Sequence, residues 1–176
     1  LIGDIYYSRN DFEVALIWHK KAHEIFNNLK INQSISESLI SMAYCESELG
    51  ITKNLDNYLK SAIKTSKDDI KIFVESIILY AKIAFKEKNI NLTKTALDKI
   101  EETDVDNLPF TTRVAYYEIF ARFHNYSGNN KKTEEYYSKL DLLLNRLFSD
   151  IQDSWHLSFT NNPRIKSAKE LLYDLR

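Results

Sequence analysis

The sequence predicts an all-α protein made of about four antiparallel helix pairs, followed by a C-terminal capping helix. A template of small and apolar residues occurs four times, at offsets of 40, 38 and 40 residues. Only 3 Gly and 2 Pro among 176 residues favour long, uninterrupted helices. A hydrophobic content of 44%, with 12% aromatic residues, is enough to form a core. Because four copies in step rarely arise by chance, the repeat determines the predicted fold.

Each copy of the template has a small residue on its first helix, then a turn, then an apolar position on its second helix. The small residues are Gly3, Ala43, Ala81 and Ala121. Residues three, four and seven apart share one helical face, so a small residue there lets the partner helix approach closely. We therefore expect Ala81 and Ala121 to be fully buried. The turns need a residue that tolerates a left-handed backbone, and Gly50, Asn89 and Gly128 lie where this requirement falls.

Sequence signals for helix starts define the elements in order. The expected helices span residues 1–9, 12–29, 34–49, 52–66, 70–88, 91–102 (with a start at 91 or 93), 110–127 and 131–148. Ser34-x-x-Glu37 is a capping box, and Ser66-x-x-Asp69 is a similar start signal. Pro109 is tolerated in the first turn of the helix that follows the acidic linker at 103–107. These helices group into repeats at about 1–30, 31–67, 68–106 and 107–148.

The remaining residues, 149–176, depart from the template and are expected to form capping helices. Ser149-x-x-Gln152 is another capping box, which would start a short helix through Trp155 and Phe159. Pro163 ends that helix, and an amphipathic helix is expected over 165–176. A repeat array needs an atypical terminal unit to cover the exposed apolar face of its last repeat.

The template resembles the tetratricopeptide repeat (TPR), whose signature sets small, aromatic and alanine residues at these offsets in a unit of about 34 residues. The resemblance covers residues 1–148 and implies a right-handed α-solenoid. The chain departs from the signature in four ways: its period is longer, Glu46 replaces an aromatic residue, the closing proline is missing, and the early tryptophan is absent. The place of the signature's early tryptophan is taken by Leu39, Ile77 and Tyr117.

Longer helices and degenerate signatures are typical of the repeats in bacterial signalling and transcription regulators. The segment Ser158-Phe159-x-x-Asn162-Pro163 resembles the close of such repeat regions in large regulators that join an ATPase module to an output domain. The chain also opens with Leu1 and not Met, and its first copy lacks the front half of the first helix. We therefore expect an excised TPR region of a larger bacterial regulator that acts in signal transduction.

Composition excludes several other classes of function. A net charge of -1 gives no electrostatic footprint for nucleic acid or an anionic membrane. The single cysteine, Cys45, argues against a disulfide framework and favours the cytoplasm. No signal peptide, membrane span, phosphate loop, dinucleotide fingerprint or nucleophile elbow is visible in the sequence. We expect a protein that is not an enzyme and needs no cofactor.

A few residues could carry chemistry, but each has a simpler structural interpretation. His19 and His23 share a helical face, as in zinc proteases, yet the adjacent Glu and a third ligand are missing. His124 occupies a core aromatic position, and Cys45 fits a buried thiol. No metal site or catalytic residue is expected.

The resemblance implies a partner-binding concave groove lined by the first helix of each pair. Mapped onto this sequence, the groove residues are Tyr7, Glu37, Ile40, Tyr44, Ser47, Ile78, Lys82, Phe85, Lys86, Glu118, Arg122, Asn125 and Tyr126. Cations, amides and tyrosines suit an extended peptide, whose backbone needs donors and acceptors. The expected partner is thus a protein or peptide, with homo-oligomers possible. Two alternatives stay open: a cytosolic sensor of signal peptides, similar to quorum receptors, and a structural or dimerisation arm with an empty groove.

Overall fold

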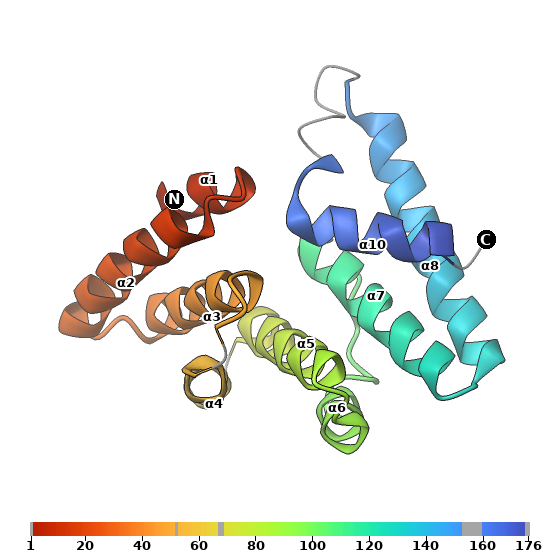
Figure 1. The fold of residues 1–176 in the computed structure, drawn as a ribbon, viewed down its shortest axis with the longest axis horizontal. Helices are drawn as coiled ribbons and strands as arrows, with labels where there is room; N and C mark the ends of the chain where they lie inside the picture. The colour runs from red at the N-terminus through yellow and green to blue at the C-terminus, as the bar shows by residue number, and fades with distance from the viewer. Residues whose placement is uncertain (1, 52, 67–68, 153–159, 175–176) are drawn as a thin grey trace. The chain divides into compact units, whose positions relative to one another are not determined.

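The computed structural model describes residues 2–51, 53–66, 69–152 and 160–174, and these are helical with no strand. Figure 1 shows the helices in chain order. They are α1 (Ile2–Ser8), α2 (Phe12–Leu29), α3 (Asn32–Glu48), α4 (Leu55–Thr65), α5 (Ile70–Lys86), α6 (Ile90–Leu97), α7 (Phe110–Tyr126), α8 (Asn130–Asp150) and α10 (Pro163–Asp174). The prediction of an all-helical, repeat-like fold is confirmed.

The chain divides into two compact units, unit 1 over Leu1–Glu101 and unit 2 over Glu102–Arg176. Unit 1 contains three helix pairs, α1–α2, α3–α4 and α5–α6, and neighbouring pairs pack through α2 on α3 and α4 on α5. Unit 2 contains the pair α7–α8, with α10 packed mainly on α7. The terminal helix therefore belongs to the same compact unit as the fourth helix pair.

The turns inside the four pairs repeat with the period of the sequence template. The residues with a left-handed backbone at these turns are Asn10, Gly50, Lys88 and Gly128, with φ of 62°, 70°, 59° and 71°. In each turn the next backbone N–H bonds the carbonyl five residues earlier, on Tyr6, Glu46, Ala84 and His124. This is the Schellman ending of a helix. Its offsets of 40, 38 and 40 residues confirm the assigned register of the repeats.

The third turn shows a local error in the prediction. Lys88, and not Asn89, has the left-handed backbone. Asn89 instead caps α6, where its side chain accepts from the N–H of Leu92. Asp11 and Asn129 cap α2 and α8 in the same way. The equivalent position in the second repeat is Ile51, which has no side-chain acceptor, and α4 starts only at Leu55.

Two of the predicted capping boxes are wrong. Ser34 lies inside α3, which begins at Asn32 without a side-chain cap, and Ser149 lies inside α8, which continues to Asp150. At the start signal Ser66-x-x-Asp69, the N-cap of α5 is Asp69 and not Ser66, and the Asp69 side chain accepts from the N–H of Ile72. The short helix expected through Trp155 and Phe159 falls outside the described residues.

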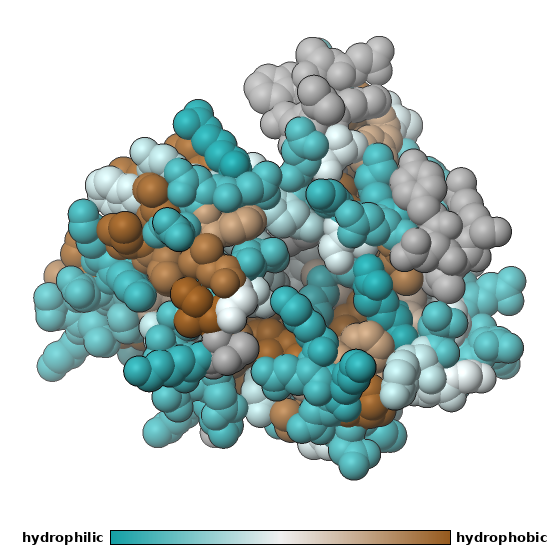
Figure 2. Space-filling model, viewed as in Figure 1, coloured by the Kyte–Doolittle hydropathy of each residue, from teal (hydrophilic) through white to brown (hydrophobic). Residues whose placement is uncertain are grey.

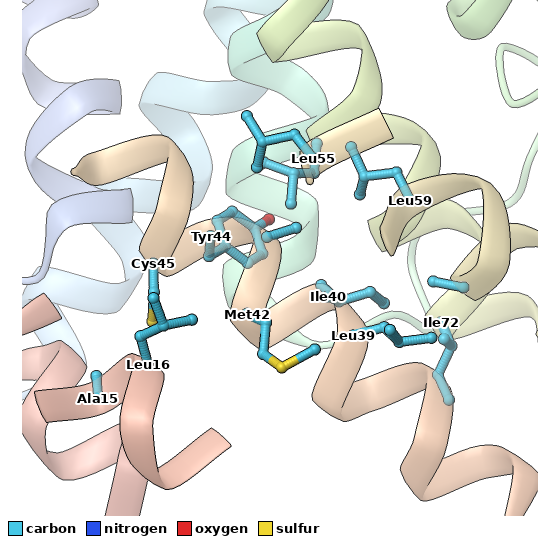
Figure 3. Packing of buried hydrophobic residues seen from close by; sticks show 13 residues of the cluster. Ala15, Leu16, Leu39, Ile40, Met42, Tyr44, Cys45, Leu55, Leu59 and Ile72 are labelled. Carbon is cyan, nitrogen blue, oxygen red and sulfur yellow. The ribbon is translucent and has the colours of Figure 1, made fainter. Parts of the chain in front are cut away.

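The small residues of the template lie where helices pack together. Ala43, Ala81 and Ala121 are each 0% exposed, which confirms the prediction for the last two. In unit 1, apolar residues of α2, α3, α4 and α5 form one cluster, part of which Figure 3 shows, with Leu16 of α2 near Cys45 of α3. Burial raises the pKa of the Cys45 thiol to about 12.

In the second, third and fourth repeats, residues twelve apart, one on each helix of the pair, are matched to each other. In the fourth repeat His124 stacks on Tyr136, with the ring centroids 5.6 Å apart. The third repeat has two small residues at the same register positions, Ala84 and Ala96, and both are buried. In the second repeat the buried carboxylate of Glu46 accepts from Asn54 Nδ2 at 3.1 Å. Burial and then the nearby Glu46 raise the pKa of the Tyr58 hydroxyl. The Oε2 atom of Glu46 has no hydrogen-bond partner among the described residues, so Glu46 replaces an aromatic residue in this core position with only one of its two oxygens bonded.

The first repeat has a matched pair of its own, Gly3 against His19. The other repeats combine a buried alanine with Leu59, Leu97 or Tyr137 at these two positions. A Cβ on Gly3 would lie 2.6 Å from the Cε1 and Nε2 atoms of the His19 ring. Burial lowers the pKa of His19, and Asp4, whose Oδ1 is 3.9 Å from Nε2, opposes that shift only in part.

Acidification should destabilise unit 1 through His19. The unfolded chain has a His19 pKa near 6.5 and the folded chain a lower one, so the unfolded state binds more protons between these two values. The stability contributed by neutral His19 is thus complete above pH 6.5 and is lost as the pH falls through this window. We expect a smaller loss of stability on acidification in His19→Leu than in the wild type, measured by urea unfolding at several pH values. Identical pH profiles for the two proteins would contradict this.

Candidate functional site

In unit 1 the first helices carry aromatic and basic side chains of the predicted groove. Tyr7 of α1 contacts Tyr44 of α3, with ring centroids 6.2 Å apart, and also contacts Phe12 at 5.3 Å. Lys82 and Phe85 of α5 are half-buried, and Lys86 is exposed. Ser47 is half-buried and Glu37 exposed on α3. We call the partly or fully exposed residues of this group the unit 1 face; they are Tyr7, Glu37, Ser47, Lys82, Phe85 and Lys86.

Other predicted groove residues of unit 1 lie in the core. Ile40 and Ile78 are 3% and 0% exposed, and Tyr44 is 6% exposed. Ile40 and Tyr44 belong to the apolar cluster of α2, α3, α4 and α5. These three side chains are covered by other residues of the chain, so a partner cannot contact them directly. Figure 2 shows hydrophobic residues in groups over unit 1, within a largely hydrophilic surface.

In unit 2 two of the predicted groove residues are engaged by the chain's own C-terminal helix. Glu118 is buried, with a side chain 2% exposed, and accepts from Arg122 Nε at 3.0 Å and from the Ser167 hydroxyl of α10. Arg122 Nη2 also donates to the backbone carbonyl of Ser167 at 3.0 Å. Asn125 and Tyr126, at the end of α7, are exposed. The sequence template gave no signal for Ser167, because residues 149–176 lie outside the repeats.

His23, one of the residues considered for chemistry, has a structural partner. His23 Nδ1 lies 2.9 Å from Ser38 Oγ, which itself donates to the Ile35 carbonyl, so the ring nitrogen is the donor to Ser38. The described residues contain no group of three or more His, Cys, Asp or Glu side chains that could hold a metal ion.

Across the same residues, none of the helices combines the length and the apolar character needed to cross a bilayer.

A shallow cavity of about 270 Å³ lies along one side of α8. It is lined by Asn130, Thr133, Glu134 and Tyr137. The Tyr137 hydroxyl is already engaged, because it donates to the Leu172 carbonyl of α10 at 3.1 Å. The cavity thus offers few convergent polar groups to a ligand.

Comparison with protein-family models, with curated proteins and with solved structures finds no match to this chain.

Proposed function

We propose that this chain is a non-enzymatic scaffold that binds a protein or peptide, built as a TPR-like right-handed solenoid within a larger bacterial signalling or transcription regulator of the cytoplasm. The single observation that carries the proposal is the unit 1 face. There, Tyr7 packs on Tyr44 while Lys82, Phe85 and Lys86 stay at least partly accessible. Aromatic edges next to flexible cations suit an extended peptide, because rings hold its side chains and cations bind its carbonyls.

Binding of a peptide selected on the full chain tests this proposal. The probe is the tightest-binding member of a library of short random peptides, titrated by calorimetry. Lys82→Ala should weaken binding about tenfold, since a hydrogen bond from a charged donor contributes about 1.5–3 kcal/mol. The matched control is Lys94→Ala on α6, whose ammonium pairs with Asp98 at 2.7 Å. Failure to select any peptide, or equal effects of the two variants, would contradict the proposal.

A second candidate, a dimerisation arm, is favoured by the apolar edge of α1. Ile2 and Ile5 are 48% and 52% exposed. Their register equivalents in the second repeat, Met42 and Cys45, are buried in the cluster that includes α2. Sedimentation of the full chain at increasing concentration tests this candidate. A dimer that Ile5→Lys dissociates would support it, and a monomer at all concentrations would exclude it.

A further inference from the structure

One position of the repeat is apolar in unit 1 but carries a glutamate in the fourth repeat, where it contacts α10. The second and third repeats have Ile40 and Ile78 at this position, 3% and 0% exposed. The fourth repeat has Glu118, which is 1% exposed. The chain thus uses an apolar side chain at this position in unit 1 and a carboxylate where its terminal helix packs on α7.

The polar contacts of this junction go to a hydroxyl and to the backbone of α10. Glu118 accepts from the Ser167 hydroxyl, and Arg122 donates to the Ser167 carbonyl. From α8, Tyr137 donates to the Leu172 carbonyl. Two of these three contacts would form with any helix, since they bind main-chain oxygens. Among these three contacts, the one between Glu118 and the hydroxyl depends on the sequence of the docked helix.

The apolar contacts of α10 also follow a simple pattern. Its buried residues are Ile165, Ala168, Leu171 and Leu172, exposed by 9% or less. This one-sided arrangement is how an amphipathic helix lies in a groove formed by other helices. A different helix with apolar residues at the same spacing and a hydroxyl at the Ser167 position would make the same contacts.

We propose that α10 is a displaceable intramolecular ligand of the α7 face, and that a serine-bearing amphipathic helix of a partner protein replaces it there. The part concerning the partner rests on the proposed scaffold function, whereas the release of α10 does not. A buried carboxylate must be desolvated, so this junction is less stabilising than an apolar one of the same size but rejects helices without a matching donor. A permanent cap has no need of that discrimination.

Hydrogen exchange of the full chain tests the release of α10 without any variant. If α10 opens by itself, its amides over 165–172 exchange at least about tenfold faster than the buried amides of α7. Ser167→Ala should accelerate exchange in α10 by about a further tenfold and leave α7 unchanged. Equal protection of α10 and α7, in the wild type and in Ser167→Ala, would overturn the proposal.

A labelled peptide with the sequence of residues 163–174 tests the selectivity of the α7 face. It should bind the full chain saturably, and a peptide with Ser167→Val should bind about tenfold more weakly. A Glu118→Ile chain, which restores the residue type of the other repeats, should reverse this preference. Equal binding of both peptides to both chains would overturn the proposal, as would a dimer of the chain formed by exchange of α10. Loss of random-peptide binding on its own would contradict only the proposed scaffold function.

Discussion

Replacing Arg122 by alanine is expected to lower the free energy of unfolding of unit 2 by about 2–3 kcal/mol. The substitution removes a charged donor from Glu118, whose side chain is 2% exposed and cannot recover the lost contact from solvent. It also removes the bond from Arg122 to the Ser167 carbonyl that holds α10. Arg122 is among the residues predicted to line the groove, but in the structure it binds Glu118 and the backbone of α10.

A matched control for Arg122 is Lys139 on α8. It also pairs with a glutamate four residues earlier, Glu135, but both partners are about half exposed. Lys139→Ala should cost about 0.5 kcal/mol or less, as is usual for pairs in solvent. Urea unfolding of both variants measures the difference. Equal destabilisation would show that Glu118 does not depend on Arg122 more than a surface acid depends on its partner.

Gly3→Ala is expected to destabilise unit 1 by about 1–3 kcal/mol, even though alanine is the better helix former. The new methyl group would overlap the His19 ring, whose Nδ1 atom lies 2.8 Å from the Cβ position. His19 is only 7% exposed, so a shift of its ring would have to displace neighbouring groups. The cost therefore arises from overpacking at one contact, which thermal or urea unfolding can measure.

The other repeats supply the compensating change. They place a leucine or tyrosine opposite the small residue, as Leu59 does for the alanine at position 43. In a His19→Leu background, Gly3→Ala should become neutral, or stabilising by about 1 kcal/mol through helix propensity. A double-mutant cycle with no coupling between positions 3 and 19 would show that the register of the first repeat is assigned wrongly.

Most of the fold follows from the sequence, because one period governs both the turns and the buried small residues. The recurrence of Gly50 and Gly128 at the same place was enough to locate the turns. What the sequence did not predict is local. Lys88 adopts a left-handed backbone because Asn89 is needed as a cap. Two serines were mistaken for helix starts although they lie inside helices, Ser34 in the first turn of α3 and Ser149 in the last turn of α8.

The candidate site was harder to predict than the fold. A helical period predicts on which face of its helix a residue lies, but it does not predict whether another part of the chain packs over that face. Ile40, Ile78 and Glu118 lie on first helices as expected, yet they are buried. Ser167, the residue that completes the Glu118 contact, belongs to a segment without the repeat. Only the packing of α10 on α7 shows that two of the four predicted groove residues of unit 2, Glu118 and Arg122, are engaged by the chain itself.

The footprint of a bound peptide on the isotope-labelled full chain tests the binding face most directly. We expect the selected peptide to change the NMR signals of first-helix residues in unit 1, above all Ser47, Lys82 and Phe85. Signals of the second helices α4 and α6 should stay in place. A footprint on α4 and α6, with those of α3 and α5 unchanged, would show that the peptide binds the opposite face and would contradict the proposed scaffold.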